Sequence, residues 1–452
     1  MKLEYARVHL VGAGGAGMSA IAKVLAGLGH EVSGSDQRGG STLDRLTDFG
    51  IATYTGHRPD VARKADLVVA SSAVPDRDPE LVAAAEIGIP VWRRPDLLDA
   101  LTAGVPTLGA TGTHGKTTTT ALLVAALRAA GEDPSFIVGG DLAYWNTNGH
   151  HGESDLLVLE ADEAFRTFER LHLDGLVVTN VEPEHLEHFG TEEDLIASFV
   201  EVARRVKGPV VACVDDAGAR EVSAAAGAIT YGTDPSAQWR VTGVRSDGPG
   251  VRFDLEGPSD RVAVSLGRPG RHVALNAAGA LALLATMGRD LQSMALGLAS
   301  FRGVARRWEH RGTVNGVVLI DDYAHHPTEV AATLGAATGV VPGKVWAVFQ
   351  PHLYSRTARF QDEFGAALSQ ADEVVVTDVY GSREEPVPGV TGELVVDAVA
   401  RHGARAHYVP HRADLAGYLA DRVSAGDLVL TMGAGDITLV PTELAKRLAG
   451  SR

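Results

Sequence analysis

Two glycine-rich turns, about 100 residues apart, constrain the fold of this chain more than any other feature. The first, VHLVGAGGAGM at residues 8–18, follows an apolar run and has the pattern G-x-G-x-x-G. The second, VPTLGATGTHGKTTTTALL at residues 105–123, joins another apolar run to a pattern typical of a helix of about four turns. Turns of this kind connect a parallel strand to a helix whose N-terminus accepts phosphate. We therefore predict two separate nucleotide-type α/β domains.

The order of apolar runs predicts a third domain. Residues 238–266 alternate apolar and polar side chains, which favours a small antiparallel sheet, and the parallel pattern resumes at VNGVVLIDDYAHHP. A chain of 452 residues is also too long for one hydrophobic core. We predict an α/β protein with a Rossmann-like domain at residues 1–103, a P-loop ATPase domain at 104–303 and a Rossmann-like domain at 304–452. The central domain is expected to hold a mostly parallel sheet and the small antiparallel sheet.

Charge and cysteine content exclude several classes of protein. Lys and Arg total 41 against 57 Asp and Glu, and the net charge of −16 argues against non-specific binding to nucleic acid or to an anionic membrane. The single Cys213 cannot form an intramolecular disulfide. No apolar run approaches the roughly 20 residues that span a bilayer, and the N-terminus is unlike a secretory signal. We expect a cytoplasmic protein.

The second glycine-rich turn carries the strongest chemical signal. In TGTHGKT the backbone N–H groups can wrap phosphates, Lys116 can reach the β and γ phosphates, and Thr117 can ligate Mg²⁺. The first glycine of the usual P-loop pattern is replaced by Ala110, and the alternative is a chance Gly/Thr-rich turn. The predicted ATP-binding residues of the turn are Gly112, Thr113, His114, Gly115, Lys116, Thr117 and Thr118.

Two further residues at predicted strand ends complete a candidate magnesium site. Glu160 stands in LEADE and His185 in VEPEH, and each follows an apolar run of the central domain. Because ligands bind beyond the carboxyl ends of parallel strands, both residues are expected at the nucleotide edge together with Thr117. The alternative for either residue is a solvated loop charge. No Cys/His spacing indicates structural zinc.

The first turn indicates a diphosphate without identifying it. Its glycines fit NAD or any other diphosphate, and Asp36 at the end of the second strand fits a ribose hydroxyl in either case.

The C-terminal third contains DDYAHHP at residues 321–327 and QPHLYSR at 350–356. These two strand ends could form a pocket for a small zwitterion, with an arginine on the carboxylate. The alternative is a capped strand end with Pro327 at the start of a helix. The pocket residues are Tyr323, His325, His352 and Arg356.

Taken together, the motifs resemble the Mur ligases of peptidoglycan synthesis along essentially the whole chain. The matching segments are, in order, VGAGGAGMS, SGSD, SSAVP, TGTHGKTT, LEADE, TNVEPEH, LNAAGALA, ARRWEHRG, DDYAHHPTE, FQPHLYSR and GDLVLTMGAGD. GGAGM at the first turn with DDYAHHPTE is similar to the alanine-adding branch and its recycling relatives.

The resemblance implies an ATP-dependent ligase that joins L-alanine to UDP-N-acetylmuramate through an acyl phosphate. The three domains would hold the UDP sugar, ATP and the amino acid, with Mg²⁺ as cofactor. The implied partners are these small molecules alone, with no binding to nucleic acid or membrane. The protein is expected to be a monomer or a homodimer.

The resemblance also implies further site residues. Arg307 would join the catalytic set of Lys116, Thr117, Glu160 and His185, while Asn276 and Asp322 would contact the ATP adenosine. His325 is a guess for the base that deprotonates alanine. The residues expected at the UDP sugar are Gly12, Gly14, Gly15, Ala16, Gly17, Met18, Ser19, Asp36, His57, Ser71 and Ser72.

The chain departs from the family pattern at a few positions. Ala164 and Phe165 stand in ordinarily polar places, Val273 replaces an amide, Leu353 replaces an arginine, and Glu184 replaces an aspartate. Three alternatives stay open: a recycling ligase that adds a whole peptide, an NAD(P) oxidoreductase, and a UDP-sugar sensor without turnover.

Overall fold

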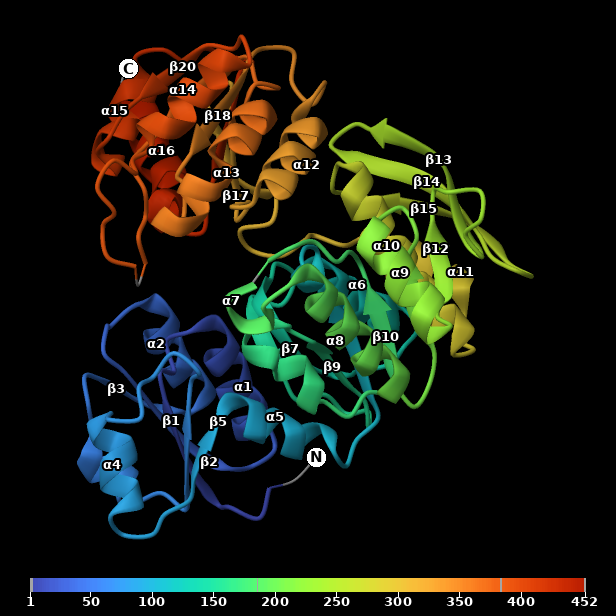
Figure 1. The fold of residues 1–452 in the computed structure, drawn as a ribbon, viewed down its shortest axis with the longest axis vertical. Helices are drawn as coiled ribbons and strands as arrows, with labels where there is room; N and C mark the ends of the chain where they lie inside the picture. The colour runs from blue at the N-terminus through green and yellow to red at the C-terminus, as the bar shows by residue number, and fades with distance from the viewer. Residues whose placement is uncertain (1–2, 185, 383, 451–452) are drawn as a thin grey trace. The chain divides into compact units, whose positions relative to one another are not determined.

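The computed structural model describes residues 3–184, 186–382 and 384–450 and contains three α/β sheets (Figure 1). By contacts the chain divides into two compact units. The first comprises residues Met1–Arg245, Arg252–Leu266 and Ala274–Arg302, and the second Ser246–Val251, Gly267–Val273 and Gly303–Arg452. Within the described ranges, no helix has the length and apolar content needed to cross a bilayer.

The N-terminal sheet, drawn in blue in Figure 1, has the parallel strand order β3-β2-β1-β4-β5. This is the order of a Rossmann-like half, so the predicted fold of this part is confirmed. Its elements are β1 (Arg7–Val11), α1 (Ala16–Gly27), β2 (Glu31–Asp36), α2 (Ser41–Arg45), η1 (Leu46–Phe49), β3 (Ala52–Thr55), α3 (Pro59–Ala62), β4 (Leu67–Ala70), α4 (Pro79–Ala85), β5 (Val91–Arg93) and α5 (Arg94–Thr102).

The central sheet has ten strands in the order β15-β14-β13-β12-β11-β10-β6-β9-β7-β8. Strand β6, which leads into the second glycine-rich turn, lies between β10 and β9, where the direction of strand addition reverses. Ligands bind at such a switch point in open parallel sheets. The predicted antiparallel strands β13 to β15 extend the edge of this sheet, because β13 pairs with β12.

The elements of the central part follow in chain order. They are β6 (Thr107–Thr111), α6 (Lys116–Ala129), β7 (Ser135–Leu142), β8 (Thr147–His150), β9 (Leu157–Glu160), η2 (Ala164–Arg170), β10 (Gly175–Val178), α7 (Leu186–Phe189), α8 (Glu192–Arg205), β11 (Val210–Cys213), α9 (Ala217–Ala226), β12 (Ile229–Gly232), β13 (Trp239–Asp247), β14 (Gly250–Glu256), β15 (Arg261–Leu266), α10 (Arg271–Thr286) and α11 (Leu291–Leu298).

The C-terminal sheet has six strands in the order β16-β17-β21-β18-β19-β20 and is parallel except for the β16–β17 pair. A third α/β sheet was predicted and is confirmed. Its elements are β16 (Glu309–Val314), β17 (Val317–Asp322), α12 (Pro327–Ala337), β18 (Val345–Phe349), α13 (Tyr354–Leu368), β19 (Glu373–Val376), α14 (Glu393–Arg401), β20 (Ala406–Tyr408), η3 (Arg412–Asp414), α15 (Leu415–Ala420), β21 (Leu428–Met432), η4 (Asp436–Leu439) and α16 (Val440–Gly450).

Helix α1 packs against the β7–β8 hairpin of the central sheet as well as against its own sheet. Buried side chains of α1 share one hydrophobic cluster with Ile137, Leu157 and Leu159. At the closest approach, a Cβ added to Gly149 would lie 2.2 Å from the carbonyl oxygen of Ala20. Only glycine allows this contact, because backbone on both sides leaves no flexible atom to move.

We expect Gly149→Ala to lower the free energy of unfolding of the first unit by about 1–3 kcal/mol through overpacking. The matched control is Gly104→Ala, because an added Cβ there meets no atom within 4 Å and the backbone is outside the left-handed region. Thermal unfolding of both variants checks the prediction. Equal midpoints for the two would contradict the packing described here.

Candidate active site

The P-loop turn is held against the end of the neighbouring strand. Gly112 has φ +129°, and a Cβ added to it would lie 2.2 Å from the Thr179 hydroxyl. The Thr113 N–H donates to the Asn180 carbonyl at 3.0 Å, and the Asn180 amide oxygen accepts the His114 N–H at 2.7 Å. The turn is therefore shaped by Thr179 and Asn180, which directly follow β10. The polar pair TN after an apolar run was the sequence signal that could have identified them.

Lys116 is the first residue of α6, at the predicted phosphate position. Its ammonium donates to the carbonyls of Gly112 at 2.7 Å and Thr113 at 3.2 Å. Both carboxylate oxygens of Glu163 lie 2.8 Å from the same nitrogen, and Asp162 lies 3.8 Å away. Burial alone would lower the pKa of Lys116, but the charges of Glu163 and Asp162 outweigh it and raise that pKa, so the ammonium stays charged at neutral pH.

Thr117 and Glu160 meet next to Lys116, as predicted for a magnesium site. The Glu160 carboxylate accepts the N–H of Gly139, and the neighbouring Thr117 hydroxyl lowers its pKa. Burial raises the pKa of Glu160, and the nearby Asp162 carboxylate raises it further. A hydroxyl beside a carboxylate is an oxygen donor set that suits Mg²⁺. The third predicted ligand, His185, lies outside the described residues.

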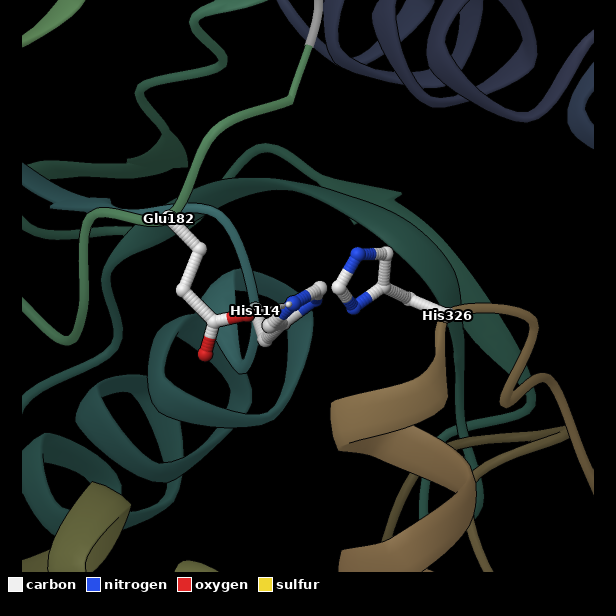
Figure 2. A group of neighbouring side chains, drawn as sticks. All are labelled: His114, Glu182 and His326. Carbon is white, nitrogen blue, oxygen red and sulfur yellow. Dashed lines mark ion pairs between the residues drawn. The ribbon is translucent and has the colours of Figure 1, made fainter. Parts of the chain in front are cut away.

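His114 of the turn points toward Glu182 (Figure 2). Its Nε2 lies 3.5 Å from a carboxylate oxygen of Glu182, and the Thr113 hydroxyl accepts the N–H of Glu182 at 2.8 Å. The segment TNVEP thus braces three consecutive residues of the turn. His326, also drawn in Figure 2, belongs to the second unit, where it is the N-cap of α12 and packs on the ring of Phe360.

Asn276 lies beside the P-loop, where an adenosine contact was expected. A Cβ added to Gly115 would lie 2.8 Å from the Asn276 amide oxygen, and Gly115 itself has φ +82°. Asn276 is buried in α10. Thr118, the last predicted residue of the turn, lies in the first turn of α6. The structure therefore brings together every described residue predicted for ATP in the first unit.

The first glycine-rich turn has the backbone geometry expected of a phosphate cradle. Gly12 has φ +83°, and its N–H donates to the Ser35 carbonyl. The N–H of Gly14 donates to one Asp36 oxygen and the N–H of Arg38 donates to the other, both at 3.0 Å. Asp36 therefore fixes the turn through hydrogen bonds that a sequence pattern alone does not reveal.

The other residues predicted for the UDP sugar gather at the same carboxyl edge of the N-terminal sheet. Ser71 directly follows β4, and its Cβ lies 3.1 Å from a Cβ added to Gly12. His57 follows β3 and makes an ion pair with Asp78 at 3.3 Å. The remaining predicted residues are Ser72, next to Ser71, and Gly15, Ala16, Gly17, Met18 and Ser19 at the start of α1.

Two residues at this turn were missed by sequence reasoning. Arg94, at the start of α5, places its guanidinium carbon 3.1 Å from a Cβ added to Gly17, and its buried Nε has no hydrogen-bond partner among the described residues. Asn148 of β8 donates to the Ala16 carbonyl at 2.8 Å and the Ser19 hydroxyl at 3.1 Å. An arginine directly after a strand was a usable signal for Arg94, whereas Asn148 is 129 residues from Ser19 and carried none.

The predicted zwitterion residues cluster at the carboxyl edge of the C-terminal sheet. The Tyr323 and His325 rings have centroids 5.1 Å apart, and the His325 and His352 rings 5.8 Å apart. The Arg356 guanidinium lies 3.4 Å from His352 Nδ1. Tyr380, which was not predicted, stacks on His352 at 6.0 Å. The alternative of a helix start at Pro327 is also confirmed, since it begins α12.

Arg307 and Asp322 lie in the same unit as this cluster. The Arg307 guanidinium packs 4.9 Å from the Tyr323 ring centre and pairs with Glu329 at 3.4 Å. Asp322 accepts the Trp308 N–H at 2.7 Å and the Ala324 N–H at 2.8 Å. Burial raises the pKa of Asp322 to about 6, although the Arg307 charge opposes the shift.

Glu329 is a further residue that sequence reasoning missed. Besides Arg307, its carboxylate accepts the N–H groups of His325 at 3.0 Å and His326 at 3.3 Å. It thereby joins the start of α12 to the arginine. Its place three residues after the N-cap was the available signal, because a carboxylate there closes a capping box.

The departures from the family pattern have identifiable surroundings. Phe165 is 42% exposed and lies 5.0 Å from the ring of His188. Val273 is buried in α10, and Leu353 is the N-cap of α13 with φ +71°. Glu184 keeps the negative charge of the aspartate that the family pattern has at this position, and this charge raises the pKa of Lys116.

Family models match the chain in three consecutive stretches. These are the Mur ligase family catalytic domain at residues 7–105, the Mur ligase middle domain at 110–284 and the Mur ligase glutamate ligase domain at 306–435. UDP-N-acetylmuramate–L-alanine ligase of Saccharopolyspora erythraea is 47% identical, covering 97% of this chain and 92% of its own length. The ligase of the same name from Kineococcus radiotolerans is 46% identical, covering 98% and 96%.

Solved structures agree with these matches. UDP-N-acetylmuramate-alanine ligase MurC from Thermotoga maritima superposes with a TM-score of 0.86 at 29% identity, covering 99% of this chain and all of its own. A murein peptide ligase from Psychrobacter arcticus has a TM-score of 0.72 at 23% identity, covering 99% of both chains, and shows the shared fold. The identity over nearly the full length of these relatives leads to one conclusion: the chain belongs to the Mur ligase family.

Proposed function

We propose that this protein is the ATP-dependent ligase that joins L-alanine to the carboxylate of UDP-N-acetylmuramate. The observation that carries the proposal is that Glu160, at the end of β9, lies beside Lys116 and Thr117 of the P-loop, in a chain aligned nearly end to end with alanine ligases. The same relatives favour L-alanine over a whole peptide as the incoming group. The likeness to the murein peptide ligase supports the fold alone.

The chemistry explains the need for ATP. A carboxylate cannot expel oxide when an amine attacks it, so a carboxylate oxygen of the sugar first attacks the γ-phosphorus and ADP leaves. The alanine nitrogen then attacks the acyl carbon, loses a proton and expels phosphate. The first step brings polyanions together, so catalysis depends on positioning and charge neutralisation, which we assign to Lys116 and Arg307.

Each part of the chain takes one substrate in this proposal. Residues 1–103 hold the UDP sugar, with the pyrophosphate on the first glycine-rich turn and Arg94 as an additional positive contact. Residues 104–303 hold ATP, with Asn276 at the adenosine. Residues 304–452 hold alanine among Tyr323, His325, His352 and Arg356, and Asp322 is assigned to the adenosine as well.

Mg²⁺ is proposed as the cofactor, held by Thr117, Glu160 and His185. The Thr117 hydroxyl and the Glu160 carboxylate supply the oxygen donors that this ion prefers. When bound, the ion would neutralise phosphate charge.

Further proposals concern the setting of the enzyme. We assign it to the cytoplasm and expect a monomer or homodimer whose partners are its small-molecule substrates. The net charge of −16 supports the absence of nucleic-acid or membrane binding. An NAD(P) oxidoreductase would leave Lys116 and Glu160 unexplained, and a sensor without turnover would not need the Lys116 ammonium.

The amino-acid specificity is tested by phosphate release with ATP, Mg²⁺ and UDP-N-acetylmuramate in the presence of L-alanine, of other amino acids or of a tripeptide. We expect L-alanine to stimulate release, because the cluster around Tyr323 is lined by side chains suited to a small zwitterion. A tripeptide that stimulates more strongly than L-alanine would overturn the assignment.

Loss of the Lys116 ammonium is expected to abolish most of the activity. Lys116→Ala should lower kcat by about 10²–10³, as removal of an electrostatic donor does elsewhere, while UDP-sugar binding is retained. Steady-state kinetics and calorimetric titration with the UDP sugar measure the two effects. Lys207→Ala, which removes an exposed lysine of the same domain, is the matched control and should behave as the unaltered enzyme.

Neutralising the proposed magnesium ligand should change the metal requirement. For Glu160→Gln we expect the Mg²⁺ concentration that gives half-maximal phosphate release to rise about tenfold or more, because one anionic oxygen is lost. Glu193→Gln on the exposed face of α8 makes the same change of charge and serves as control. An unchanged Mg²⁺ requirement in Glu160→Gln would remove this residue from the site.

A further inference from the structure

The ion pair between Lys116 and Glu163 has no place in the reaction described above. Both Glu163 oxygens lie 2.8 Å from the Lys116 nitrogen, and the Glu163 side chain is 3% exposed. Glu163 reaches this position because β9 ends at Glu160 and the chain then turns back over the start of α6. A buried carboxylate thus lies in direct contact with the ammonium of the P-loop.

The hydrogen bonds of Lys116 show what ATP would have to replace. An ammonium has three N–H donors, and here two carbonyls of the turn and the Glu163 carboxylate accept them. The carbonyls of Gly112 and Thr113 belong to the P-loop itself. Glu163 belongs to a different segment and is the acceptor that can be exchanged without rebuilding the loop.

Charge favours the exchange. A triphosphate and a carboxylate at the same ammonium repel each other, and burial strengthens this repulsion relative to water. Asp162, 3.8 Å from the same nitrogen, adds a second negative charge but does not contact the ammonium directly.

The segment after Glu163 has a backbone that favours such a displacement. Phe165 and Arg166 follow with φ +54° each, two consecutive left-handed residues with side chains. Left-handed backbone is unfavourable for a residue with a Cβ, so the segment is held in place at an energetic cost. Release of Glu163 from Lys116 would allow this backbone to relax.

We propose that Glu163 is an anionic placeholder in the P-loop, which neutralises Lys116 in the nucleotide-free enzyme and is displaced by the β and γ phosphates of ATP. Glu163 then limits the affinity for ATP and ADP and assists the exchange of one for the other. This inference rests on the proposed ATP site. Glu163 acts through Lys116 and is a positioning residue.

The test is the affinity of the full-length protein for ATP, measured by calorimetry with Mg²⁺ and again with EDTA. Glu163→Gln keeps the shape and removes the charge, so we expect the Kd for ATP to fall about tenfold in both conditions. A damaged fold would weaken binding, so a gain of affinity cannot arise from misfolding. Glu163→Asp, which keeps the charge, should return the Kd toward that of the unaltered protein.

The matched control is Asp162→Asn, which removes the same charge one residue away. If general charge reduction were responsible, this variant would tighten ATP binding as much as Glu163→Gln, and that result would overturn the inference. A Kd for ATP that is unchanged or increased in Glu163→Gln would also overturn it, the latter indicating a metal ligand instead. Absence of ATP binding in the unaltered protein would refute the proposed function itself.

Discussion

The close approach between the P-loop and the end of β10 is the constraint on which the candidate active site depends. Gly112 leaves no room for a side chain because Thr179 and Asn180 press against it. The hydrogen bonds from Thr113 and His114 to Asn180 then set the direction of the turn. A phosphate-binding loop is therefore only as rigid as the neighbouring strand that supports it. In this chain the support is the TNVEP segment.

Sequence patterns predicted the features that depend on local geometry. The two glycine-rich turns, the helix after Lys116 and the third α/β sheet are confirmed, because each is encoded within about 20 consecutive residues. The joining of β13 to the edge of the central sheet was not predicted. Hydrophobic alternation indicates that a strand exists, but pairing across a sheet depends on contacts that a local pattern does not contain.

For the candidate site too, the sequence predicted some residues and missed others. Residues at strand ends, such as Asp36 and Glu160, could be found because parallel strands bring their carboxyl ends to one edge. Asn148 and Glu163 could not, because their importance comes from what they touch in space. The roles of Glu163 and Asp36 also differ from a first reading of their motifs, because each accepts hydrogen bonds from protein donors: an N–H for Asp36 and an ammonium for Glu163.

Helix α1 packs on the β7–β8 hairpin, so the N-terminal sheet cannot be treated as an independent structural unit. The segment that begins with the first glycine-rich turn shares a hydrophobic cluster with the central sheet, and Asn148 hydrogen-bonds its first helical turn. A chimaera between two Mur ligases joined near residue 104 would therefore separate α1 from the strand to which it is fitted. An exchange that carries residues 135–150 along with the N-terminal sheet would keep the two halves of that interface together, so the unit of recombination is larger than the sheet.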